Sequence, residues 1–137
     1  MEKTKKGEKR GMKKEAVFIC SPYRAADEKE LAENVALAKR VCRYALDTGS
    51  VPYAPHLFFP QFVSEKDERQ KGMEAGLEML QRMDELWVVG NRISEGMAQE
   101  ITLASQKGIP VMTVVDPLVA EEHLLDAVFG GKDYEDE

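Results

Sequence analysis

Four short runs of apolar residues alternate along the chain with longer segments whose apolar residues recur every three or four positions. The runs have the length of buried strands and cover residues 16–20, 51–54, 86–89 and 111–115. The longer segments have the spacing of amphipathic helices and cover residues 27–47, 67–83, 95–107 and 121–129. One segment fits neither pattern: the Pro- and Phe-rich residues 55–63 are expected to form a loop.

Strands that alternate with helices of this length predict right-handed βαβ crossovers and a parallel sheet. We therefore expect a single-domain, Rossmann-like α/β fold with four to five parallel strands in flavodoxin-like order, flanked by helices. Ligands of such sheets bind outside the carboxyl ends of the strands. Residues that directly follow a predicted strand are therefore the first candidates for function.

The length of 137 residues fits one domain. Residues 1–14 carry seven Lys or Arg and two Glu, a net charge of +5, so with −6 overall the remainder carries −11. We expect a disordered basic leader over residues 1–14, the domain over residues 15–130 and an acidic tail over residues 131–137. A compact start at Met12 makes that residue an alternative initiator to Met1.

The composition, 43% hydrophobic and 32% charged, is typical of a soluble globular protein. No apolar run approaches the roughly 20 residues that span a membrane, and the charged N-terminus lacks the apolar region of a signal peptide. Two cysteines without metal-binding spacing predict neither a disulfide framework nor a metal site. We expect a cytoplasmic protein without cofactor, whose acidic body binds neither membrane nor nucleic acid polymer.

The segment that follows the third apolar run, residues 94–100, holds the most specific candidate chemistry. Ser94 stands where a helix N-cap belongs, so free backbone N–H groups and the helix dipole make an anion-binding position there. Glu100 follows about one and a half turns later among small or apolar helical neighbours. Such a carboxylate, charged near neutral pH because the helix start opposes its desolvation, suits attack on a sugar carbon. The plainer interpretation is a helix-edge glutamate that reaches water.

Further candidates follow the first two predicted strands. Pro22 restricts Ser21 to an extended conformation, which holds Ser21, Tyr23 and Arg24 in an arc at the strand mouth. Tyr23 can stack on a base and Arg24 can pair with phosphate, or the first covers the core and the second is a surface residue. His56 is either a ligand contact or a structural histidine.

Aromatic and glycine residues in the middle of the chain suggest contacts beyond a simple surface. Phe58, Phe59 and Phe62 are more apolar than a free loop requires, so we expect them to cover a ligand or a neighbouring subunit. A homo-oligomer is therefore expected. Gly72 and Gly76 each cost about 1 kcal/mol within a helix, which predicts a close approach at their face or ordinary helix–sheet packing.

Two familiar assignments, a dinucleotide-binding fold and a phospho-receiver, are excluded by the residues after the first strand. The segment from Cys20 to Arg24 contains no glycine, so the fingerprint of dinucleotide-binding folds is missing. It also lacks the acidic pair of a phospho-receiver.

Four segments carry a resemblance to a known family. They read SPYR, PYAPHLFFPQF, DELWVVGNRISEGMAQE and GIPV at residues 21–24, 52–62, 84–100 and 108–111. With them the chain resembles the nucleoside 2-deoxyribosyltransferase superfamily, above all a group of small bacterial and phage domains, over residues 17–115. It is more distantly similar to deoxynucleoside-monophosphate N-glycosidases.

The resemblance implies a role for each candidate. Glu100 matches the nucleophilic glutamate, which attacks C1′ of the sugar and expels the base. Ser94 matches the residue at the 5′ end of the sugar, which is serine in relatives that take 5′-monophosphates. Binding of base and sugar then falls to Ser21, Tyr23, Arg24, His56, Gly96 and Met97.

One departure from the family's pattern concerns the second acid, which handles the proton of the leaving base. Its matching position is Gly76. Glu74 and Glu78 lie two residues to either side, about 200° around the helix, and should face away. Another group supplies the proton, a neighbouring subunit does, or the domain binds a nucleotide without cleaving it.

Three hypotheses follow. The first is an N-glycosidase or deoxyribosyltransferase that acts on a nucleoside or its 5′-monophosphate by hydrolysis or transfer, favoured by Glu100 and Ser94. The second is a non-catalytic sensor of a nucleotide or ADP-ribose-like ligand with the same fold, favoured by Gly76. The third, a structural domain without ligand, does not account for the residues gathered at the strand ends.

Overall fold

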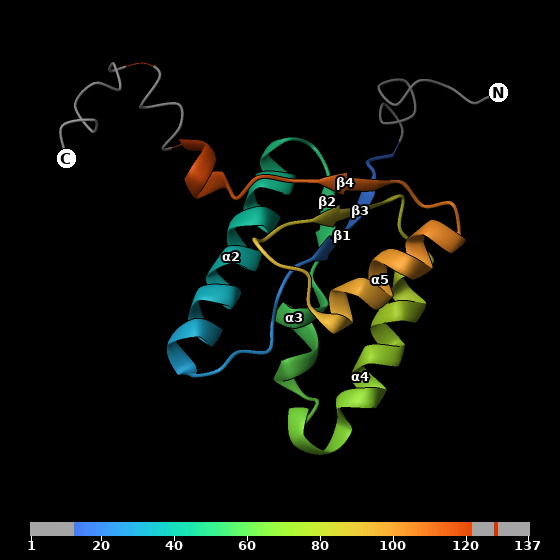
Figure 1. Ribbon diagram of the computed structural model, residues 1–137. Coiled ribbons are helices and arrows are strands. Elements are labelled where there is room, and N and C mark those ends of the chain that lie inside the picture. Colours follow the sequence, from blue (N-terminus) through green and yellow to red (C-terminus); the bar gives the residue numbers. More distant parts are fainter. Residues whose placement is uncertain (1–12, 122–127, 129–137) are drawn as a thin grey trace.

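The computed structural model describes residues 13–121 and residue 128. Its elements are, in chain order, β1 (Ala16–Cys20), α2 (Glu28–Asp47), β2 (Val51–Tyr53), α3 (Pro55–Phe58), the 3-10 helix η1 (Phe59–Gln61), α4 (Glu65–Leu80), β3 (Glu85–Val88), α5 (Glu95–Gln106) and β4 (Val111–Thr113) (Figure 1). The predicted acidic tail, most of the predicted leader and most of the helix expected over residues 121–129 lie outside the described residues.

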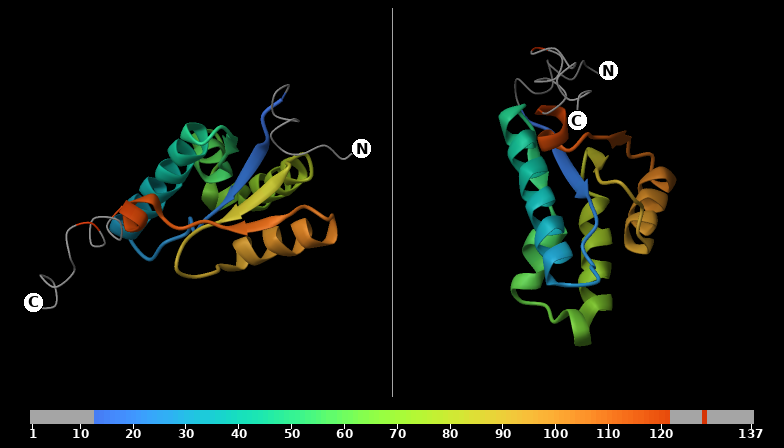
Figure 2. Two further views of the ribbon diagram at one scale, coloured as in Figure 1. Left: turned by 90° about the horizontal axis from the view of Figure 1, so that it is seen from above. Right: turned by 60° about the vertical axis from the view of Figure 1, so that its left-hand side comes forward.

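The four strands form one parallel sheet in the order β2-β1-β3-β4. This order confirms the predicted α/β fold with a flavodoxin-like arrangement. Helix α2 covers one face of the sheet, and α4 and α5 lie side by side on the other (Figure 2).

The strand residues alternate between two apolar cores, as the pleat of a strand requires. On the α2 side, Val17 and Ile19 pack with Val41, Ala45 and neighbouring side chains. On the opposite side, the core contains Phe18, Cys20, Leu80, Leu86, Met97 and Ala104. Because α4 and α5 are fixed on this second core, the first turns of α5 lie next to the carboxyl end of β1.

Side chains cap the two longest helices and so set where they begin. Asp27 accepts a hydrogen bond from the Glu30 N–H (2.8 Å), and Ser64 accepts one from the Asp67 N–H (3.2 Å). The sequence predicted that this helix begins at residue 67. Because Ser64 is the cap, α4 begins at Glu65 instead. It also ends earlier, at Leu80 instead of residue 83.

The loop predicted over residues 55–63 is wrong, since most of it is helical. Pro55 and Pro60 occupy the first turns of α3 and η1, where the fixed φ of proline fits a helix and its missing N–H has no partner to lose.

The loops after β1 and β3 touch at the carboxyl edge of the sheet. Gly90 has a φ of +121°, and a Cβ atom there would lie 3.0 Å from Pro22 Cδ. Only glycine meets both conditions without strain. Within residues 13–121 and 128, none of the helices has the length and hydropathy needed to cross a membrane.

Candidate active site

A cavity of about 460 Å³ opens at the carboxyl edge of the sheet, on the side of α4 and α5. Its walls come from the loop after β1, from α3 and η1, from the inner face of α4 and from the first turns of α5. The volume is within the range of small-molecule sites. Seven of the eight site residues predicted from the sequence line it: Tyr23, Arg24, His56, Ser94, Gly96, Met97 and Glu100.

Glu100 projects into the cavity from the second turn of α5, and its Oε1 atom is buried without a hydrogen-bond partner among the described residues. Burial raises the pKa of its carboxyl from 4.5 to about 7, although a hydrogen bond from the Cys20 thiol partly opposes the rise. Burial dominates this shift, as desolvation among apolar neighbours predicts, and a pKa near 7 leaves part of the groups charged at neutral pH.

Two side chains at the carboxyl ends of strands lie near Glu100. Cys20, at the end of β1, is fully buried; burial and the Glu100 charge raise the pKa of its thiol, so it is not a nucleophile at neutral pH. Tyr53, at the end of β2, also has its pKa raised by burial and by Glu100, and its buried hydroxyl has no partner among the described residues. Tyr53 was not predicted as a neighbour of Glu100, although its position at a strand's carboxyl end was a usable signal.

Tyr23 and His56 form an aromatic stack in the cavity wall, with ring centroids 4.9 Å apart and ring planes at 20°. Burial and the Arg69 charge lower the pKa of His56 to about 4, against a hydrogen bond to the Ser21 backbone that favours the charged form. The imidazole is therefore neutral at neutral pH, and the stack offers an uncharged aromatic surface.

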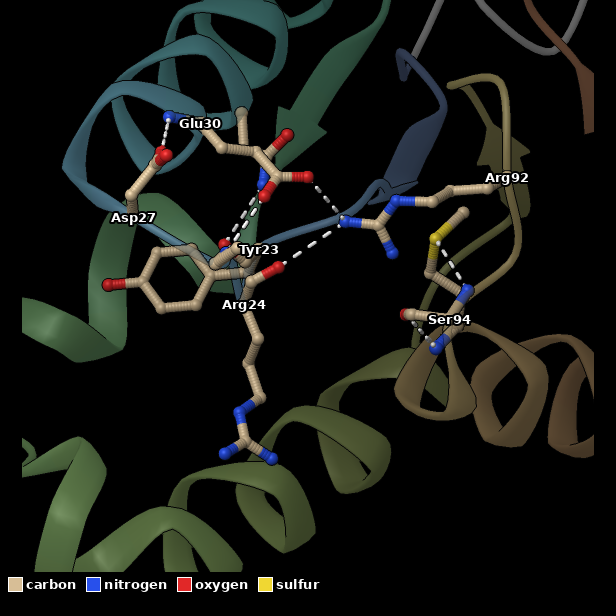
Figure 3. A network of polar contacts seen from close by, with 9 residues as sticks. Tyr23, Arg24, Asp27, Glu30, Arg92 and Ser94 are labelled. Atoms are coloured by element: carbon tan, nitrogen blue, oxygen red, sulfur yellow. Dashed lines mark hydrogen bonds and ion pairs between the residues drawn. The ribbon is translucent and has the colours of Figure 1, made fainter.

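The rim of the cavity carries three arginines that are tied to glutamates. Glu65 Oε2 accepts from Arg69 Nε (3.1 Å) and forms an ion pair with Arg24 Nε (3.5 Å). Arg92 Nη2 donates to the Arg24 carbonyl (3.3 Å) and to Glu30 (3.4 Å). Figure 3 shows the Arg24 side chain extending toward α4, away from these two contacts. Guanidinium groups therefore surround the entrance.

The start of α5 has the predicted cap. The Met97 N–H donates to Ser94 Oγ (3.2 Å), and the Ser94 N–H donates to Met97 Sδ (3.5 Å) (Figure 3). The Met97 side chain is 1% exposed and belongs to the core, so it has little surface with which to contact a ligand. Gly96 leaves open space where a side chain would lie.

Ser21 is the one predicted site residue that does not line the cavity. It is 1% exposed, and its hydroxyl has no partner among the described residues. Alternation along the extended chain turns it away from the cavity, on whose side Cys20 lies. The backbone of Ser21 still contributes to the cavity wall, because it forms a hydrogen bond with His56.

The close approach expected at Gly72 and Gly76 is not found. A Cβ atom would lie 3.5 Å from Val63 Cγ1 at Gly72 and 3.8 Å from Pro55 Cβ at Gly76, which are ordinary contacts. Both glycines line the cavity and widen it. The neighbouring glutamates face away, as predicted: Glu74 accepts from Gln70, and Glu78 pairs with Arg82.

The three phenylalanines of α3, η1 and the residue after them form one aromatic cluster with edge-to-face contacts at 5.0 to 5.8 Å. Phe59 lines the cavity, whereas Phe58 and Phe62 remain 51% and 61% exposed. Of the three phenylalanines, only Phe59 therefore lies where it can cover a ligand in the cavity.

Comparisons with known proteins place the fold and the family. A solved structure of a 2-deoxyribosyltransferase from the psychrotolerant bacterium Bacillus psychrosaccharolyticus is similar at a TM-score of 0.53 and 23% identity, over 73% of this chain and 72% of that one. No curated protein sequence matches the chain. The sequence profile of a domain family described as "Domain of unknown function (DUF7768)" matches residues 15–114. The chain therefore belongs to the DUF7768 family.

Proposed function

We propose that this protein cleaves or transfers at the N-glycosidic bond of a nucleoside or its 5′-monophosphate, with Glu100 as the nucleophile. The observation that carries the proposal is a carboxylate that projects into a cavity next to an aromatic stack, with one buried oxygen that has no partner among the residues the structure describes. A poorly solvated carboxylate attacks more readily than a hydrated one. The likeness in fold to a 2-deoxyribosyltransferase supports the same chemistry.

Each wall of the cavity has a part in this reaction. The stack of Tyr23 and His56 holds the base by its aromatic face. The start of α5 with Ser94 holds the 5′ end of the sugar. Between them, Glu100 attacks C1′ and forms a glycosyl ester, which water or a second base then resolves.

The function is tested by incubating the pure full-length protein with a panel of nucleosides and 5′-monophosphates and by measuring free base chromatographically. Release of base from at least one of them is the expected result. Saturable binding without release from any of them contradicts the proposal and favours the sensor hypothesis instead.

A 5′-monophosphate is expected to bind more tightly than its nucleoside, because Arg24 and Arg92 stand at the rim. In a Glu100→Gln background, which prevents turnover, Arg24→Ala should weaken monophosphate binding about tenfold or more, since a charged hydrogen bond contributes about 1.5–3 kcal/mol. Nucleoside binding should hardly change. Calorimetry measures both, and Arg43→Ala, which removes an exposed arginine of α2, is the control. Equal affinity of wild-type protein for nucleoside and monophosphate contradicts this part.

We also propose that the protein is a homo-oligomer, because Phe58 and Phe62 leave an apolar surface exposed beside the cavity. Phe62→Asp should shift the mass measured by light scattering toward the monomer. The control is Leu46→Asp, which changes an equally exposed apolar residue on α2 (55%). A wild-type monomer at tens of micromolar contradicts the proposal.

A further inference from the structure

The cavity holds many ionisable groups, and they decide how a leaving base can be expelled. Among its described lining residues, the ionisable side chains besides Glu100 are Tyr23, His56, three arginines and the glutamates Glu30, Glu65 and Glu95. General acid catalysis needs one of them to carry a proton that it can give up near neutral pH.

None of the three glutamates is set up as such an acid. Glu30 is ion-paired with Arg92, and Glu65 is ion-paired with Arg24 and Arg69, so both carboxylates are already engaged. Glu95 is exposed in the first turn of α5, so it is open to solvent.

Tyr23 and His56 are no better suited. Burial and the Glu65 charge raise the pKa of Tyr23 above its ordinary value of 10, so it holds its proton. His56, with a pKa lowered to about 4, is neutral, and its ring is already hydrogen-bonded to the Ser21 backbone.

Besides Glu65, helix α4 presents no carboxyl group among the described lining residues of the cavity. Gly76 contributes only backbone to the cavity wall, and the nearest glutamates of the helix are engaged on its outer face. A Cβ atom at position 76 would meet only Pro55, at 3.8 Å, so the wall there has room for a side chain that the chain does not supply.

We propose that the substrate is an N-glycoside whose base is a cation, such as a pyridinium or an N-alkylated purine, because such a base leaves as a neutral molecule without receiving a proton. This inference rests on the proposed function and narrows its substrate class. An aromatic face attracts a cation, so the stack of Tyr23 and His56 can hold a cationic ring against the Arg69 charge that acts on His56.

The reaction balances without an acid. A Glu100 oxygen forms a bond to C1′ while the bond from C1′ to the base nitrogen breaks, and its electron pair neutralises the positive ring. Water then attacks C1′, the ester bond returns its electron pair to Glu100, and the proton of water goes to solvent.

The test uses the full-length wild-type protein and substrate pairs in which one base is neutral and the other is a cation: guanosine 5′-monophosphate against its 7-methyl derivative, and adenosine 5′-monophosphate against nicotinamide mononucleotide, as ribose and as 2′-deoxyribose compounds. Release of base is measured as kcat/KM after subtraction of spontaneous hydrolysis. The cationic member of each pair should be at least a hundredfold better.

Gly76→Asp adds a carboxyl group to the cavity, and Gly76→Asn is its uncharged control. We expect only the aspartate to improve the neutral substrates relative to the cationic ones. If the wild-type protein handles neutral and cationic bases alike, the inference is overturned while the proposed function stands. If it releases no base from any compound, both fail. The wild-type ratios decide the matter even if a Gly76 variant does not fold.

Discussion

Glu100→Gln is expected to lower base release by about a thousandfold or more, since removal of a nucleophile eliminates the covalent route. Glutamine preserves the shape of the side chain and the packing of α5 on the second core, so ligand binding should persist. The measurement is kcat for base release with the best substrate of the panel, together with the Kd of the same compound.

The matched control for this prediction is Glu74→Gln, which makes the same chemical change on the outer face of α4, where Glu74 accepts a hydrogen bond from Gln70. It should leave kcat unchanged. Turnover that survives in Glu100→Gln would refute the nucleophile, whatever the substrate.

The same substitution is expected to change how stability depends on pH. The folded-state pKa of Glu100, about 7, lies above the ordinary 4.5, so the folded protein binds this proton more tightly than the unfolded chain. The wild-type protein therefore loses stability from this group as the pH rises from about 4.5 to 7. Glutamine does not titrate, so Glu100→Gln has no such loss. The unfolding free energy of the wild type, relative to that of Glu100→Gln, should therefore fall by about 3 kcal/mol across this range.

Urea unfolding at a series of pH values between 4.5 and 8 measures this difference, and it needs no ligand. The control is Glu78→Gln on the exposed face of α4, where the Glu78–Arg82 pair is solvent-exposed, and its curve should run parallel to that of the wild type. Parallel curves for Glu100→Gln and wild type would mean that the carboxyl is well solvated in the folded protein.

Much of the fold could be predicted because local patterns determine it. β1 lies where its apolar run predicts, and the caps Asp27 and Ser94 start α2 and α5 at or within one residue of the expected positions. The segment from residue 55 to 63 was mispredicted because proline and clustered aromatic residues are typical of loops. The phenylalanine rings of the two short helices pack on one another, and this contact between side chains does not appear in the local pattern.

Most residues that line the cavity could be predicted from the sequence, but the pKa of the Glu100 carboxyl could not. Strand ends and the start of a helix identified Glu100, Tyr23 and His56, since the carboxyl ends of parallel strands converge. Ser21 was predicted to line the site but does not, because successive side chains of an extended chain point to opposite sides. The raised pKa of Glu100 depends on its burial and on the Cys20 thiol of β1, which is far from it in sequence.

The most direct test of the nucleophile is to find the sugar on it. Quenching the wild-type protein during turnover and digesting it with trypsin should yield the peptide of residues 93–107, carrying the added mass of the sugar or sugar phosphate. Fragmentation of that peptide distinguishes Glu100 from Glu95, and we predict the added mass on Glu100. Steady release of base with an adduct on Glu95, or with no adduct at any point of the reaction, would contradict the account.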